Sequence, residues 1–266
     1  MKTLGYENLR LEIDGGVLRV LLDRPRVHNA LNPALIGEIA SCFEEAARDD
    51  AVRVVVLSGE GRSFCAGADV GYMRQTARFS HEENVEDARR LAAMYRAIDR
   101  CPKPVVGRVF GAVVGGGCGL VASCDLVVAA EDAWFAFTEV RLGISPATIA
   151  PFVVRKIGIS HARELFLSGS RFDAGRAREI GLVHEVSSSE ALDEATERAV
   201  SRLLKGGPRA LAATKELLRE LEEHPEEATE RMAGWIARLR GGEEGQEGLG
   251  AFLEKREPAW REEVSR

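Results

Sequence analysis

The chain carries Phe64-Cys65-Ala66-Gly67-Ala68-Asp69 and, further on, Gly115-Gly116-Gly117-Cys118-Gly119, two glycine-rich stretches that say most about its structure. Each follows a run rich in β-branched residues, at 52–57 and 105–109, and each precedes a segment able to start a helix. Small residues at such a turn let a ligand approach the backbone, and the first N–H groups of a helix lack partners within it. Two such turns could direct two amide donors at one oxygen and so polarise a carbonyl group.

The length and composition are those of a soluble globular protein. With 266 residues, 45% apolar and 29% charged, the chain fits one large domain or a domain with an appendage. No apolar run reaches membrane-spanning length and residues 1–7 lack a signal-peptide profile, so we expect a cytoplasmic location and no membrane partner. The net charge of −6 argues against a general nucleic-acid surface.

The cysteines and histidines predict no metal site. The five cysteines are odd in number and show neither a CxxC pair nor a Cys/His ligand spacing, so we expect them to be reduced and structural. Cys65 and Cys118 flank the glycine turns, but nothing near them in the sequence supplies a base. They are interpreted as small apolar fillers and not as nucleophiles.

The first half of the chain has the pattern of strands alternating with helices. Residues 9–23 predict a β-hairpin, and the Asn-Pro pair that opens 32–48 predicts the start of a helix. The continuous apolar run Val52–Leu57 is typical of a strand covered on both sides. Ser80 and Glu83 have the spacing of a capping box, which predicts another helix after them.

The second half changes from strands to helices. Strands are expected at 125–130 and 134–137, and Pro208 suits a first helical turn. The expected helical segments beyond residue 160 are 160–168, 173–180, 190–205, 208–223, 226–240 and 246–256. Strands interleaved with helices and followed by a helical tail predict an α/β core with an α-helical C-terminal region.

These residues resemble the crotonase superfamily, also called the enoyl-CoA hydratase/isomerase family. The resemblance extends over almost the whole chain and follows the family's order of motifs. The motifs are Arg24–Leu31, Phe64–Asp69, Lys103–Val106, Gly115–Gly117, Cys124–Leu126, Thr138–Gly143, Ala177–Val183 and Ala251–Arg256. A single glycine-rich loop would be weak evidence, whereas this ordered set is specific.

The resemblance implies a spiral of ββα units over residues 1–200 and an α-helical region over 201–266 that mediates trimerisation, often as a dimer of trimers. It also implies an acyl-CoA thioester as substrate and no cofactor, because CoA is part of the substrate. By position, the family's two oxyanion-hole N–H groups fall on Ala68 and Gly116. Such donors suit a reaction that builds negative charge on the thioester oxygen as an enolate.

One departure from the family concerns the catalytic carboxylates. Hydratases of the family use two glutamates, of which the second maps onto Glu139, while Gly119 stands in the place of the first. Three interpretations stay open: hydration by Glu139 alone, a double-bond isomerase, or a non-catalytic CoA- or RNA-binding relative. Without the resemblance, Glu139 reads as a surface glutamate paired with Arg141.

A narrower similarity favours hydration. The stretches Gly115–Asp125 and Pro146–Pro151 are similar to those of bacterial methylglutaconyl-CoA and isohexenylglutaconyl-CoA hydratases, which keep a glycine at this place. The expected substrate is therefore a branched enoyl-CoA such as 3-methylglutaconyl-CoA, as in leucine degradation. Such a substrate carries a second carboxylate, for which Arg141, Arg74 and Arg155 are the candidate cations.

Eight further residues are expected to contact the substrate or its CoA part. They are Arg26, Val27, Ala66, Asp69, Val70, Gly115, Phe252 and Lys255. Asp69 is also expected to cap the following helix. Phe252 and Lys255, three apart and so on one helix face, would reach a CoA held by a neighbouring subunit. The alternatives are a solvated Arg26 and a core Phe252 beside a solvated Lys255.

Overall fold

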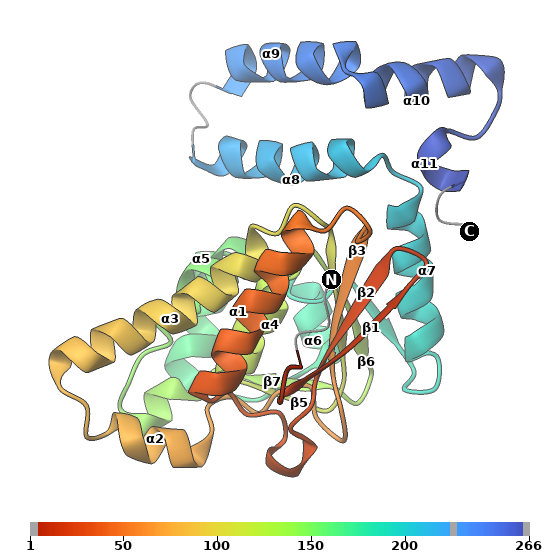
Figure 1. Cartoon of the computed structure of the whole chain (residues 1–266). Coiled ribbons are helices and arrows are strands. Elements are labelled where there is room, and N and C mark those ends of the chain that lie inside the picture. The colour runs from red at the N-terminus through yellow and green to blue at the C-terminus, as the bar shows by residue number, and fades with distance from the viewer. Residues whose placement is uncertain (1–4, 224–227, 263–266) are drawn as a thin grey trace.

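The structure is a computed structural model that describes residues 5–223 and 228–262 (Figure 1). Its strands are β1 (Leu9–Asp14), β2 (Val17–Leu22), β3 (Val54–Gly59), β4 (Val105–Val109), β5 (Ala112–Val114), β6 (Leu126–Ala130), β7 (Trp134–Ala136), β8 (Phe172–Asp173) and β9 (Glu185–Ser187). Its α-helices are α1 (Pro33–Arg48), α2 (Val70–Thr76), α3 (His81–Asp99), α4 (Gly116–Ser123), α5 (Ala150–Ser168), α6 (Ala174–Glu179), α7 (Leu192–Leu204), α8 (Pro208–Glu223), α9 (Ala228–Gly241), α10 (Glu243–Glu254) and α11 (Ala259–Glu262). Two short 3-10 helices are η1 (Pro25–Val27) and η2 (Glu139–Leu142).

Two sheets form the centre of the molecule. The larger has the strand order β1-β2-β3-β4-β6-β9, in which β1 pairs with β2 in antiparallel fashion and the other neighbours are parallel. The smaller has the order β5-β7-β8. The predicted hairpin is confirmed, since Asp14 pairs with Val17 across Gly15 and Gly16, both at positive φ.

The larger sheet is covered on both faces. Leu57 and Val105 point to one face and pack into the main core with α1, α3 and α4. Val56 and Val106 point to the other face and form a second cluster with α7. All residues of β3 are buried, as predicted for a strand covered on both sides, although the strand begins at Val54, two residues later than the predicted 52–57.

Local signals set the starts of two helices. The Asn32 side chain accepts a hydrogen bond from Leu35 N–H at 2.9 Å and caps α1. At α3, Glu83 N–H donates to Ser80 Oγ (3.2 Å), and Ser80 N–H donates to Glu83 Oε2 (2.7 Å). Both predicted helix starts are therefore confirmed.

The strand before the second glycine-rich stretch differs from the prediction. Residues 105–109 form β4, but the chain then turns at Gly111 (φ 58°) into β5, and it is β5 that leads into Gly115. A Cβ on Gly111 would lie 2.2 Å from Arg62 O, so glycine permits this turn. A three-residue strand is too short to leave a periodic signal, and β5 was not predicted for that reason.

The helical half begins earlier than predicted. The expected segment 160–168 is only the second part of α5, which starts at Ala150. Gly158 lies inside α5 with the non-helical angles φ 72° and ψ 160°, so the helix is kinked there. A glycine in that position interrupts the sequence pattern and hides the first part of the helix.

The C-terminal helices lie apart from the sheets. Figure 1 shows α9 and α10 end to end in one row beyond the core, with α8 alongside that row and α7 leading to α8. Pro208 begins α8 as predicted, and in the part of the chain that is described no helix is long and apolar enough to cross a membrane. The expectation that Phe252 and Lys255 share one helix face is wrong. Helix α10 ends at Glu254, and Lys255 follows it with a left-handed backbone conformation (φ 55°).

Candidate active site

Two segments that are far apart in the sequence run side by side. Cys65 N–H donates to Ala112 O at 3.2 Å, and Val114 N–H donates to Cys65 O at 3.0 Å. The first glycine-rich stretch therefore lies along β5 and ends beside the start of α4. A Cβ on Gly67 would lie 4.0 Å from Gly116 N, which shows how closely the two turns meet.

Glycine is required at two points of this approach. Gly67 has φ 94°, and a Cβ on it would lie 2.9 Å from Val114 O. A Cβ on Gly117 would lie 2.3 Å from Cys65 O. Real Cβ atoms do not come so close to backbone oxygens, so the two turns could not meet with larger residues there.

The meeting point presents two backbone donors. Among the described residues, neither Ala68 N–H nor Gly116 N–H donates a hydrogen bond to the protein, whereas Leu31 N–H donates to Gly67 O at 2.7 Å. Gly116 is the first residue of α4, where a helix leaves its N–H groups free. Ala68 is exposed and Gly116 is half-buried.

Glu139 lies next to this point. The chain reaches it from β7, because Gly115 N–H donates to Ala136 O at 2.9 Å and holds β7 against the second turn. A Cβ on Gly115 would lie 3.2 Å from Glu139 Oε1. Glu139 Oε2 is buried and has no hydrogen-bond partner among the described residues. Burial raises the pKa of Glu139, so the site favours a carboxyl that can carry a proton.

The surroundings of Gly119 are filled by two side chains. A Cβ on this residue would lie 2.5 Å from Ile149 Cγ2 and 2.8 Å from the Tyr95 ring. Tyr95 is fully buried and its hydroxyl donates to Gly116 O at 3.0 Å. Sequence reasoning did not select Tyr95, because a tyrosine on the apolar stripe of α3 reads as core.

Asp69 joins the first turn to two other segments. Its Oδ1 accepts from Gly71 N–H (2.8 Å) and Tyr72 N–H (3.2 Å), so the predicted cap of α2 is confirmed. Its Oδ2 pairs with Arg24 at 3.0 Å, and Arg24 also donates to Ala30 O. Arg24 was not a candidate, although its contacts fix the loop before α1 against the site.

The remaining predicted contact residues are spread over the surface. Arg26 and Val27 lie exposed on η1, Val70 is 66% exposed at the start of α2, and Ala66 is half-buried in the first glycine-rich stretch. Phe252 is 81% exposed on α10, which excludes the alternative that Phe252 belongs to the core of the chain. In Figure 1, α10 lies far from α2 and α4, so one chain does not bring Phe252 and Lys255 to the site.

The three candidate cations differ in their surroundings. Arg155 is held by Asp99 and by Glu222 (3.7 Å). Arg74 and Arg141 are exposed and form no ion pair among the described residues, so Glu139 is not the ion-paired surface residue considered above. Arg155 is thus engaged elsewhere, and the other two stay candidates.

Cys65 and Cys118 have no features of nucleophiles. Both are fully buried, and burial raises the pKa of Cys65 to about 12 and that of Cys118 further. The Cys118 thiol lies 3.2 Å from Val113 O, to which it can donate. Their interpretation as fillers is confirmed.

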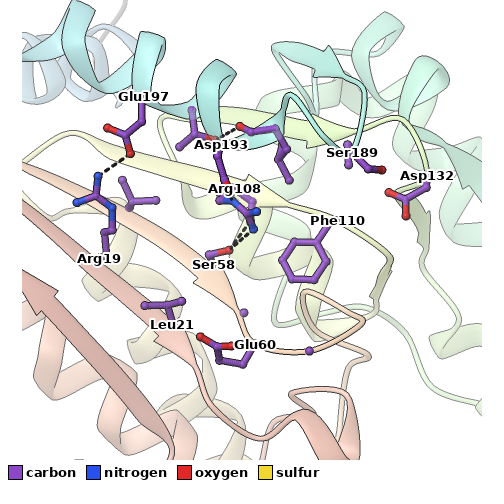
Figure 2. Close-up of a pocket in the computed structure, with 16 residues that line it drawn as sticks. Arg19, Leu21, Ser58, Glu60, Arg108, Phe110, Asp132, Ser189, Asp193 and Glu197 are labelled. Atoms are coloured by element: carbon purple, nitrogen blue, oxygen red, sulfur yellow. Dashed lines mark hydrogen bonds and ion pairs between the residues drawn. The ribbon is translucent and has the colours of Figure 1, made fainter.

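A pocket of about 600 Å³ lies on the α7 face of the larger sheet and shares no lining residue with the site (Figure 2). Figure 2 shows its arginines already paired, Arg19 with Glu197 at 2.5 Å and Arg108 with Asp193 at 2.6 Å. Arg108 also bonds Ser58 Oγ at 3.3 Å. None of the predicted site residues lines this pocket, and we assign it no part in the chemistry.

Comparison with known proteins identifies the family of this chain. The model of the enoyl-CoA hydratase/isomerase family matches residues 12–263. The 2,3-dehydroadipyl-CoA hydratase of Escherichia coli is 36% identical over 250 residues, which cover 92% of this chain and 95% of that protein. An enoyl-CoA hydratase from Shewanella pealeana has a similar structure, with a TM-score of 0.93, 38% identity and coverage of 96% and 97%. Pseudomonas aeruginosa AtuE gives a TM-score of 0.92, 39% identity and coverage of 96% and 100%.

The chain belongs to the enoyl-CoA hydratase/isomerase family and has the crotonase fold. Both were expected from the order of its sequence motifs.

Proposed function

We propose that this protein adds water across the 2,3 double bond of an enoyl-CoA thioester. The observation that carries the proposal is the close approach of the two turns that hold Ala68 N–H and Gly116 N–H, neither bonded within the described residues, beside Glu139, whose buried Oε2 has no partner there. The family is one of hydratases and isomerases of such thioesters. No metal or further cofactor is needed, because the amides stabilise the negative charge and CoA arrives with the substrate.

The thioester oxygen would accept hydrogen bonds from both amides. As a nucleophile adds to Cβ, the electrons of the double bond move toward the thioester and the oxygen becomes an enolate. Both bonds strengthen at that moment, and loss of one such donor typically costs about 2.7–4 kcal/mol of transition-state stabilisation. The donors are main-chain groups, so side-chain changes at Ala68 or Gly116 would act by steric effects.

Glu139 would do the acid and base work alone. Its carboxylate takes a proton from water while the water oxygen bonds to Cβ, and the carboxylic acid then gives that proton to Cα. The raised pKa brings Glu139 closer to the pH at which a group can both accept and return a proton. Tyr95 and Ile149 occupy the space beside Gly119, so this site is packed for one carboxylate.

The acyl group is proposed to be branched and to carry a second carboxylate, as in 3-methylglutaconyl-CoA. The similarity of Gly115–Asp125 and Pro146–Pro151 to hydratases of that kind supports this choice. A relative of similar length is named for 2,3-dehydroadipyl-CoA, which also carries a second carboxylate. Arg141, on η2 with Glu139, and Arg74 on α2 are the cations proposed to meet that carboxylate.

A double-bond isomerase is the second candidate, favoured by the single carboxylate. One glutamate suffices to carry a proton between two carbons of an enolate, and no water is then added. Incubation with 2-enoyl-CoA and 3-enoyl-CoA separates the two functions. A hydratase forms 3-hydroxyacyl-CoA from the 2-enoyl ester, whereas an isomerase interconverts the esters without a hydrate. Binding of the esters without either product would indicate a non-catalytic relative.

We also propose that the chain forms a homotrimer or a dimer of trimers through its C-terminal helices. The described part of α8 buries none of its residues within the chain. Large apolar side chains are exposed on these helices: Leu218, Ile236, Leu249, Phe252 and Leu253. An apolar surface of this kind on a projecting region is typical of a protein interface. In such an assembly Phe252 and Lys255 would approach a CoA of another subunit.

A further inference from the structure

Lys156 on α5 is a buried cation that the proposed reaction does not use. Its Nζ is shielded from solvent and has no hydrogen-bond partner among the described residues. It lines a cavity of about 240 Å³ where the ends of α3 and α4 meet α5 and α8. Burial lowers the pKa of Lys156, so its charge is costly without a partner.

The carboxylates around this cavity hold other cations. Asp99 pairs with Arg155, as does Glu222 at 3.7 Å, and Asp125 pairs with Lys215 at 2.5 Å. Arg219 also lines the cavity and, in the ranges described, makes neither an ion pair nor a hydrogen bond. Four cations therefore face three carboxylates, which leaves one positive charge over.

Neutral neighbours do not supply the missing negative charge. Burial raises the pKa of Cys124, which lines the cavity, to about 12, so it stays a thiol. His184 is kept neutral, because burial and the charge of Lys156 lower its pKa to about 4. Deprotonation of Lys156 would balance the charges of the cavity, but it would still leave Arg219 without a carboxylate of its own, since an arginine does not lose its proton.

We propose that this cavity binds a small oxyanion, of the size of phosphate, between Lys156 and Arg219. The anion would neutralise the excess charge and accept hydrogen bonds from Arg219 and, once the Lys156 side chain turns its shielded Nζ toward the cavity, from Lys156. Because Lys156 belongs to α5 and Arg219 to α8, the anion would join the C-terminal helices to the core, next to the bond of Lys215 to Asp125. This site is separate from the two glycine-rich turns and does not depend on the proposed reaction.

Thermal unfolding of the full chain tests the proposal. Sodium phosphate, sulfate or acetate is titrated at constant ionic strength with NaCl, and the three arms separate tetrahedral oxyanions from carboxylates. We expect a saturable rise of the midpoint with phosphate or sulfate, of about 3–5 °C at ten times the Kd. In Lys156→Met this rise should disappear, while the matched control Lys205→Met, an exposed lysine, should respond as the wild type does.

Phosphate and sulfate also stabilise proteins in a general way, so the difference between the wild type and Lys156→Met is the quantity that counts. Arg219→Gln gives a second test that leaves Lys156 in place, and we expect it to weaken the Kd for phosphate at least tenfold. Equal shifts in the wild type and both variants, or no shift beyond that of NaCl in the wild type, would overturn the proposal. If only acetate raised the midpoint of unfolding, the site would bind carboxylates, and the proposal of a phosphate-sized oxyanion would be overturned.

Discussion

Gly119 offers the sharpest test of how this site is packed. The residue is buried in α4, and the change Gly119→Ala would normally stabilise a helix by about 0.5–1 kcal/mol. Here the added Cβ would lie 2.5 Å from Ile149 Cγ2 and 2.8 Å from the Tyr95 ring. Forcing an extra methyl group into a packed core costs about 1–3 kcal/mol, so we expect Gly119→Ala to lower the free energy of unfolding.

A double-mutant cycle identifies the clash as the cause. Ile149→Ala alone removes a buried side chain and should cost about 2–5 kcal/mol. In the double variant the Cβ at 119 enters the space that Ile149 leaves. The loss of unfolding free energy in the double variant should therefore be smaller than the sum of the two single losses by at least about 1 kcal/mol. Urea unfolding of the four proteins measures these energies. A neutral or stabilising Gly119→Ala, or costs that simply add, would refute the packing described here.

Three further predictions concern other parts of the molecule. Tyr95→Phe keeps the ring but loses the bond to Gly116 O, and we expect kcat to fall up to about tenfold with little change in KM; an unchanged kcat would show that the hydroxyl does not position the second turn. Phe252→Glu should lower the fraction of oligomer measured by light scattering. The control Ile13→Glu, which changes another exposed apolar residue on β1, should leave that fraction unchanged. Glu139→Gln should stabilise the protein over the wild type more at pH 8 than at pH 5. The raised pKa favours the protonated carboxyl, so the contribution of Glu139 to stability is present below its unfolded value of 4.5 and is lost as the pH rises through the folded value. A gain that is equal at both pH values would contradict this.

The sequence was sufficient for features that depend on local chemistry. The capping box at Ser80, the Asn32 cap and the buried strand after residue 52 follow from side chains close to each other in the chain. The ordered motifs were enough to predict the crotonase fold, because their order over almost the whole chain resembles that of the family. The similarity around Gly119 to hydratases of branched substrates led to the prediction of a branched enoyl-CoA, and this substrate is still a proposal.

Features that depend on distant segments were not predictable. Strand β5 is three residues long and is defined by its pairing with β7, in which Ala112 lies opposite Trp134, 22 positions further along the chain. Tyr95 lies on α3 and reaches Gly116 only in the folded chain. The helix-face prediction for Lys255 failed because the helix ended one residue earlier than the spacing assumed.

The central claim is that one carboxyl beside two converging amides performs the reaction, and Glu139→Gln tests it most directly. The variant keeps the shape of the side chain but cannot accept a proton from water. We expect kcat for hydration of a 2-enoyl-CoA to fall by about 10²–10⁴-fold, while the Kd of an unreactive acyl-CoA changes by no more than about twofold. Hydration at a wild-type rate in this variant would contradict the account.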